Sequence, residues 1–227
     1  MDFFVVYGLT IISLIITLIA QGFVSGSYRR YKKISNSRGM NGCNAAKEIL
    51  YKSGLSDVKV EEVSGVLADH YDPRDKTVRL STDVYHGTSI ASISVAAHEV
   101  GHAIQDKDGY FFMRLRASLV PVVNFSSYAG YFSILIGFMF GALSLVWLGI
   151  LCEIAILGFQ LVTLPVELNA SKRALKKIKE YNLLEEGKEI RRGRTMLRAA
   201  AMTYVASVAT TLIQILRLVL IVGRRND

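Results

Sequence analysis

Cysteine and proline are scarce in this sequence, which argues against a disulfide-stabilised secreted domain. Of 227 residues only two are cysteine and three are proline. Cys43 and Cys152 lie far apart and form no CxxC pair, so neither a disulfide framework nor a cysteine metal motif is predicted. The formal net charge is +8, but we find no aromatic-interleaved basic groove and no nucleic-acid-binding motif. A nucleic-acid partner is therefore not expected.

Charge is also scarce in three long apolar runs, at residues 4–24, 119–165 and 201–222. The first has no charged residue, the second contains only Glu153, and Arg217 interrupts the last. The first is long enough to cross a bilayer core of ~30 Å as a helix. A cleavable signal peptide is the competing interpretation. It is disfavoured because the run has no basic start and no clean cleavage site. The second run is too long for one crossing and suits two, near 119–140 and 143–165. We therefore expect about four transmembrane helices.

The polar segment 25–118 has the pattern of a small α+β domain. In chain order, the predicted elements are a helix, two strands and a second helix, at 44–51, 63–67, 77–81 and about 89–105. Thr88 or Ser89 is expected to cap the second helix. The strand 77–81 is predicted to be an edge strand that pairs with an extended peptide.

The basic residues predict the orientation of these segments. Segments 25–118 and 166–199 hold 24 of the 27 Lys and Arg residues, and four crossings place both segments on one side of the membrane. The remaining three, Arg217, Arg224 and Arg225, lie near the other side. Because positive charge is retained in the cytoplasm, we expect a cytoplasmic polar domain and external termini.

The strongest chemical signal is His-Glu-Val-Gly-His at residues 98–102. His98 and His102 are four residues apart, so on a helix both imidazoles can reach one Zn²⁺ ion. Glu99 then lies beside the metal site, where a carboxylate serves as the general base. A chance occurrence of this motif is the competing interpretation. It is weakened because ring nitrogens buried in an apolar helix are costly without a partner.

A catalytic zinc site needs a third protein ligand, and Glu167 is the best candidate. It follows directly after the third predicted span, and the small Ala170 and Ser171 nearby permit close approach of a second helix. A glutamate that merely pairs with Lys or Arg at the membrane interface is the alternative. His70 and His86 are the only other histidines, and both lie upstream of the motif.

Several further motifs resemble the YugP-like neutral zinc metallopeptidases of bacteria. These motifs cover nearly the whole chain and lie at 69–74, 78–81, 98–105, 165–175 and 199–205. The family resembles the membrane heat-shock zinc proteases and the CAAX prenyl proteases, whose third ligand opens a Glu-x-x-Ala-Asp pattern. Here Ser171 replaces the aspartate, which puts a carboxylate role at that position in doubt. Asn169 or Ser171 is then expected to orient a ligand histidine.

The resemblance implies a membrane-embedded zinc metalloendopeptidase with one Zn²⁺ per chain. Its substrates are expected to be peptides or proteins, including membrane proteins under quality control, and its location the bacterial plasma membrane. A peptidase for one dedicated peptide and a non-catalytic scaffold with a structural or vestigial zinc are the alternatives. The oligomeric state is left open. Four residues are candidates for stabilising the oxyanion: His70, Tyr85, His86 and Asn169.

The predicted fold class is a mainly α membrane protein with a small, zincin-like α+β catalytic domain in the cytoplasm. The expected parts are an anchor, the α+β catalytic part, a transmembrane hairpin, cytoplasmic helices with the third ligand, and a last transmembrane helix with a tail, at 1–24, 25–118, 119–165, 166–199 and 200–227. Glu153 lies within the third span, where a charge is expensive. We expect Glu153 to face the helix bundle and to be either protonated or paired, with Gln160, Gln214 and Arg217 as candidate partners. The alternative is a polar spot that handles transmembrane substrates.

Overall fold

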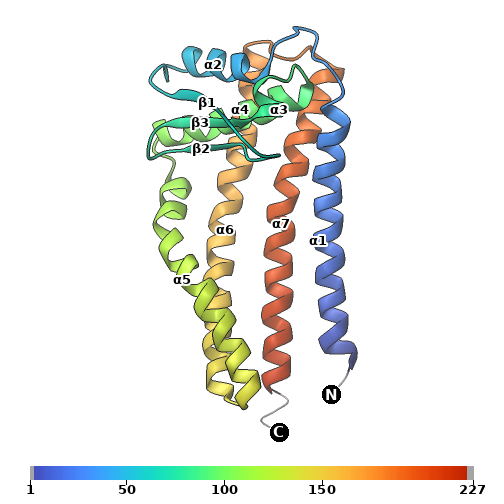
Figure 1. Cartoon of the computed structure of the whole chain (residues 1–227), viewed down its shortest axis with the longest axis vertical. Coiled ribbons are helices and arrows are strands. Elements are labelled where there is room, and N and C mark those ends of the chain that lie inside the picture. The colour runs from blue at the N-terminus through green and yellow to red at the C-terminus, as the bar shows by residue number, and fades with distance from the viewer. Residues whose placement is uncertain (1–2, 224–227) are drawn as a thin grey trace. The chain divides into compact units, whose positions relative to one another are not determined.

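The computed structural model describes residues 3–223, with side chains from Tyr7 onwards, and consists mainly of helices (Figure 1). Arg224 and Arg225, which entered the orientation argument, lie outside the described residues. In chain order the elements are α1 (Phe3–Tyr31), α2 (Gly42–Lys52), β1 (Lys59–Val63), β2 (His70–Asp72), β3 (Thr77–Ser81), α3 (Thr82–Tyr85), α4 (Ile90–Lys107), α5 (Phe111–Phe140), α6 (Leu143–Glu180) and α7 (Lys188–Gly223).

The chain divides into two compact units. The first, here called the membrane unit, comprises Met1–Gln21, Arg114–Pro165 and Thr203–Asp227. The second, the polar unit, comprises Gly22–Met113 and Val166–Met202. Four of the described helices, α1, α5, α6 and α7, are long and apolar enough to cross a membrane. The prediction of a mainly α membrane protein with four spans and a small α+β part is therefore confirmed.

Small residues bring α5 and α6 close together within the membrane unit. A Cβ atom on Gly149 would lie 2.3 Å from Ile134, and one on Gly137 would lie 2.9 Å from the backbone nitrogen of Val146. The two helices are joined at Gly141, whose φ of +69° favours glycine. Glycine contacts of this kind suit a bilayer, where van der Waals packing rather than water drives helix association.

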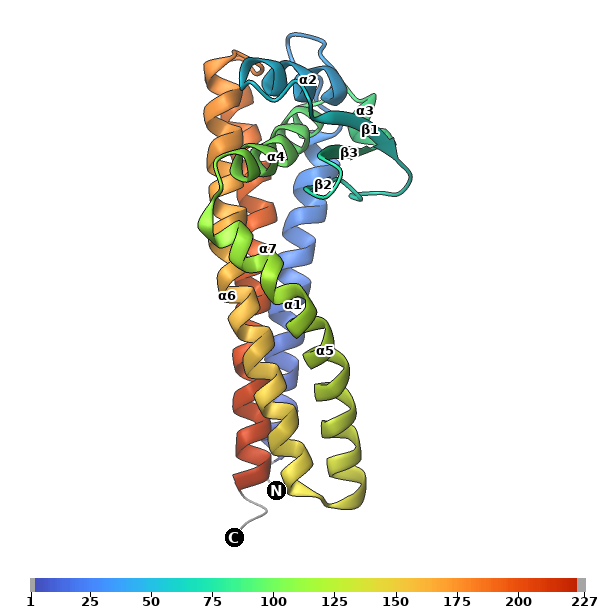
Figure 2. The same ribbon diagram turned by 90° about the vertical axis from the view of Figure 1, so that its left-hand side faces the viewer.

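The three-stranded sheet of the polar unit has the order β1-β3-β2, with β1 parallel and β2 antiparallel to β3 (Figure 2). The prediction that Thr77–Ser81 forms an edge strand is therefore wrong, because β3 is the central strand. Val78 and Leu80 of β3 are fully buried. The first strand is β1 at Lys59–Val63, not Val63–Leu67. Its sequence, KVEEV, is charged because an edge strand has little to bury, so the hydrophobic alternation was weak.

Helix α4, which carries the histidine motif, is buried along most of its length. Ser89 caps it as predicted, with its side chain accepting a hydrogen bond from the Ser92 amide. The helix ends at Lys107, slightly beyond the expected end at Gln105. Ile90, Ile93 and the small residues around the motif pack into the core of the polar unit. This burial fixes the helix that presents the predicted metal ligands.

Candidate metal centre

Three predicted metal ligands converge within the polar unit. His98 and His102 lie on α4, and Glu167 lies on the part of α6 that belongs to the same unit. The Nε2 atoms of His98 and His102 lie 3.2 and 3.6 Å from Oε2 of Glu167. One ligand atom from each residue can be chosen so that all three lie within 4.8 Å of one another. Two elements that are distant in sequence thus supply a single cluster of donor atoms.

This arrangement fits a tetrahedral zinc site. With metal–ligand distances of ~2.0–2.1 Å, neighbouring ligand atoms of a tetrahedron are separated by roughly 3.3 Å. The two distances from Glu167 bracket that value. The donor set of two imidazoles and one carboxylate is also that of a catalytic zinc centre, which keeps a fourth position open. The residues present therefore fit the ion that the motif predicts.

A chain of hydrogen bonds fixes the ring of His102. Arg173 can only donate, and its Nε donates to Oδ1 of Asn169 (2.7 Å). Oδ1 of Asn169 also accepts from Nε2 of Gln105 (3.0 Å). Because the nitrogen of the Gln105 amide points to Asn169, its oxygen, Oε1, faces Nδ1 of His102 (3.0 Å). Because Oε1 of Gln105 can only accept, Nδ1 of His102 must carry the proton. Its Nε2 lone pair is then directed at the metal position.

The ring of His98 has a different partner. Its Nδ1 lies 3.2 Å from the hydroxyl of Ser171, which can accept the ring proton and leave Nε2 available to a metal. Ser171 occupies the position at which the Glu-x-x-Ala-Asp pattern has aspartate. A neutral hydroxyl therefore contacts one ligand histidine where a carboxylate was in doubt. Asn169 is linked to His102 through Gln105. Ser171 and Asn169, the two residues expected to orient a ligand histidine, are thus connected to His98 and His102 respectively.

The two ligand-bearing helices pack unusually close at Gly101. A Cβ atom added there would lie 2.6 Å from the backbone oxygen of Ala170, which is fully buried. Gly101 is the residue before His102, and Ala170 lies three residues after Glu167. The small residues at both positions therefore determine how near the two imidazoles come to the carboxylate.

Burial and charge shape the protonation of the site. Burial raises the pKa of Glu99, whose side chain lies near both histidines. Burial alone would raise the pKa of Glu167, but its hydrogen bonds with His102 and His98 hold it well below the usual range. Burial alone would lower the pKa of His102, but Glu167 and Glu99 raise it. These buried carboxylates favour positive charge at the site, which is what a cation supplies.

The other predicted candidates have different surroundings. His86 contacts Glu62 through Nε2 (3.1 Å), and Nδ1 of His70 contacts the backbone oxygen of Ala68 (2.8 Å). None of the hydrogen bonds described above for His98 and His102 involves His70, His86 or Tyr85. Asn169 is held between Gln105 and Arg173. Among the candidate oxyanion donors, Asn169 is linked to a ligand histidine, and this link passes through Gln105.

Gln105 and Arg173 are the site residues that the sequence did not reveal. Gln105 is fully buried and also donates to the backbone oxygen of Val166 (2.8 Å). A signal for it was present, because Gln105 lies three residues after His102, on the same face of an otherwise apolar helix. Arg173 gave no signal of its own in a segment rich in basic residues.

Comparison with known proteins gives two matches over nearly the whole chain. The family model described as "Putative neutral zinc metallopeptidase" matches residues 6–223. A Bacillus subtilis (strain 168) protein described as "Putative membrane protease YugP" is 45% identical over 219 residues, which cover 96% of this chain and 97% of that protein. No solved structure matches.

We predict that Gly101→Ala weakens zinc binding, because its methyl group forces α4 away from Ala170 and separates the histidines from Glu167. Overpacking of this kind should lower the free energy of unfolding by about 1–3 kcal/mol. Zinc affinity is measured by competition with a chromophoric chelator. The control is Gly26→Ala, since a Cβ atom at Gly26 meets nothing within 4 Å. Equal zinc affinity in both variants would contradict the proposed helix contact.

We also predict that Gln105→Leu and Asn169→Ala each reduce zinc affinity by about 10- to 100-fold, the usual effect of losing a partner of a metal-binding histidine. In Gln105→Leu, Nδ1 of His102 loses its acceptor, and in Asn169→Ala the Gln105 amide loses one of the two acceptors that fix its orientation. Asn44→Ala, at an exposed position on α2, is the matched control for Asn169→Ala. Unchanged affinity in both test variants would show that the hydrogen-bond chain does not orient His102.

Proposed function

This chain belongs to the family of neutral zinc metallopeptidases, as the predicted resemblance implied, and we propose that it hydrolyses peptide bonds. In this proposal His98, His102 and Glu167 bind one zinc ion per chain, and Glu99 is the catalytic base. The observation that carries it is the convergence of the three ligand atoms beside a buried glutamate. Within the described residues, this is the one cluster of three or more His, Cys, Asp or Glu side chains that could bind a metal ion.

When bound, zinc supplies Lewis-acid polarisation of the scissile carbonyl and lowers the pKa of a water molecule towards ~7. Glu99 accepts the proton of that water and later delivers it to the leaving amine. Burial raises the pKa of Glu99, and a raised pKa is the direction that a general base working near neutral pH requires. Asn169 holds His102 through Gln105, and Ser171 contacts His98 directly, so residues of α6 orient both ligand histidines.

The edge of the sheet gives a place for an extended peptide. Because β3 is central, the edge strands of the sheet are β1 and β2. Of these, β2 is linked to α4, because the Tyr71 hydroxyl donates a hydrogen bond to Asp106 (2.9 Å). We assign peptide binding by β-augmentation to β2. Main-chain hydrogen bonds at this edge would hold the substrate beside the motif helix with little sequence demand.

The substrates proposed are membrane proteins, including damaged ones. The chain itself is a membrane protein, and its Bacillus relative is described as a membrane protease. A peptidase for one dedicated peptide has the same site and differs only in substrate. A non-catalytic scaffold with structural zinc is less well supported, because such a site needs no buried glutamate next to the first histidine.

Replacing Glu99 by Gln tests catalysis directly. We predict that Glu99→Gln retains zinc but loses casein or membrane-protein cleavage by about 10²- to 10⁴-fold, because the general base is gone. Zinc content is measured by atomic absorption, and cleavage by gel assay. Glu186→Gln, at an exposed position, is the control and should cleave normally. Equal cleavage by both variants would favour the scaffold.

We place the polar unit in the cytoplasm of the bacterial cell, with the membrane unit in the plasma membrane. The support is the distribution of basic residues, 24 of 27 of which lie in segments 25–118 and 166–199. Arg29 and Arg30 lie within the last turn of α1, immediately after its apolar part. Retention of these charges in the cytoplasm sets the orientation of the first span.

Cysteine labelling in intact cells tests this orientation. We predict that Ser56→Cys, exposed in the polar unit, resists a membrane-impermeant maleimide until the cells are lysed. Ala142→Cys, at the turn between α5 and α6, should react in intact cells. The parent protein is the control, because Cys43 and Cys152 are both buried. Labelling of Ser56→Cys before lysis would contradict the proposed orientation and place the polar unit outside the cytoplasm.

A further inference from the structure

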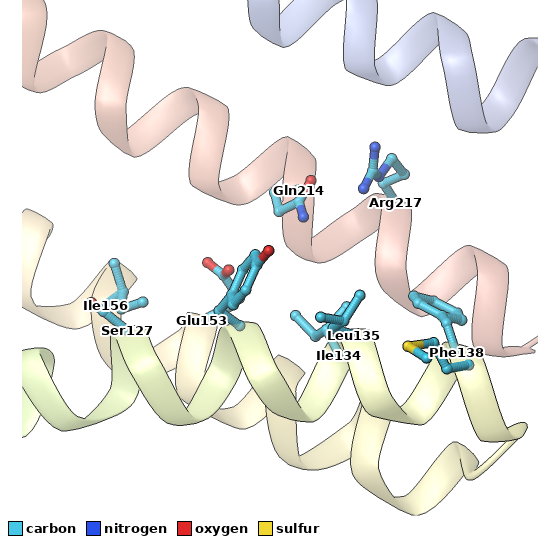
Figure 3. A pocket seen from close by; sticks show the side chains of 10 residues that line it. Ser127, Ile134, Leu135, Phe138, Glu153, Ile156, Gln214 and Arg217 are labelled. Carbon is cyan, nitrogen blue, oxygen red and sulfur yellow. The ribbon is translucent and has the colours of Figure 1, made fainter.

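The membrane unit contains a cavity of about 680 Å³ between α5, α6 and α7 (Figure 3). Most of its lining is apolar, with aromatic rings from α5. Four polar residues interrupt this lining: Ser127 from α5, Glu153 from α6, and Gln214 and Arg217 from α7. The volume far exceeds that of one trapped water molecule, which takes ~30 Å³ in the liquid. The cavity is therefore large enough for a side chain of another molecule.

Glu153 has no partner within this cavity. Of the three residues expected to pair with it, Gln214 and Arg217 line the same cavity, yet in the described part of the chain Glu153 makes no hydrogen bond or ion pair. Arg217 instead donates from Nη1 to the hydroxyl of Thr10 on α1, and its buried Nε has no acceptor among the described residues. The cavity thus presents an acceptor at Glu153 and a neutral amide at Gln214, neither engaged by the other.

An unpartnered polar group at membrane depth is expensive, and such groups commonly serve binding or transport. A partner that contacts the apolar lining of this cavity must itself be largely apolar. To satisfy both sides, it must donate to Glu153 and accept from Gln214. A carboxamide side chain on an apolar helix has this combination of groups.

We propose that this cavity binds the carboxamide of an Asn or Gln residue within a transmembrane helix of a substrate protein. The NH₂ group of that amide donates to Glu153, and its oxygen accepts from Gln214. The apolar lining contacts the rest of the helix. This inference rests on the proposed function as a membrane protease, and it assigns that protease a preference for spans that carry a misplaced polar residue.

The test measures binding without proteolysis. The full-length Glu99→Gln protein is reconstituted in lipid nanodiscs. It is titrated with dansyl-labelled, Leu-rich peptides of about 20 residues that carry either Asn or Leu at the centre. Trp147, the only tryptophan of the chain, lies on α6 about 9 Å along the helix axis from Glu153 and serves as the energy-transfer donor. We expect the Asn peptide to bind about three- to tenfold more tightly than the Leu peptide.

Variants locate the preference within the cavity. Glu153→Leu should bind both peptides equally, whereas Glu153→Gln should keep most of the preference because it still forms hydrogen bonds. Leu151→Ala, a neighbour that is 62% exposed and does not line the cavity, should keep all of it. If Glu153→Leu fails to fold, Gln214→Leu takes its place, with the same expected loss of preference.

Two results would overturn the inference: equal binding of both peptides by the Glu99→Gln protein, or an undiminished preference in Glu153→Leu or its substitute. Cleavage is measured separately with the unmodified protein. A preference in binding without any cleavage would reject the proposed protease activity and leave the cavity assignment intact. Cleavage without a preference in binding would do the reverse.

Discussion

The contact between α4 and α6 at Gly101 and Ala170 is the constraint on which the candidate site depends. The two helices bring ligands that are far apart in sequence to one point, and they do so only because neither helix has a bulky side chain at the contact. Hydrogen bonds from α6 to α4 then fix the rotation of the ligand rings. Close packing places the donor atoms, and the hydrogen bonds orient them.

The hydrogen-bond chain from Arg173 to His102 shows how a donor that cannot accept fixes the groups beyond it. Arginine forces the orientation of the Asn169 amide, that amide forces the orientation of Gln105, and Gln105 assigns the proton on the histidine. Gln105 and His102 are buried, and an unsatisfied polar group there would cost about 1–3 kcal/mol. Because breaking these hydrogen bonds is costly, the donor and acceptor at each step from Arg173 to His102 are well defined.

The two units meet different physical demands. In the polar unit, water drives apolar residues such as Val78 and Leu80 into a core, and the buried Gln105 and His102 are hydrogen-bonded to each other. In the membrane unit, glycine contacts such as that of Gly149 replace the hydrophobic effect as the source of close packing. Against that background the unpaired Glu153 is conspicuous, because the bilayer offers no water to solvate it.

The sequence by itself determined the mainly helical class, the four membrane segments and the choice of metal ligands to examine. Long apolar runs and the spacing of His98 and His102 carry that information locally, in the sequence of each segment. Strand order was decided by the tertiary structure alone. The charged strand β1 has no clear alternation, and its parallel pairing with β3, which makes β3 central, is a non-local choice. The role of Gln105 likewise exists only once α6 lies against α4, since its partners Asn169 and Val166 are more than sixty residues away in sequence.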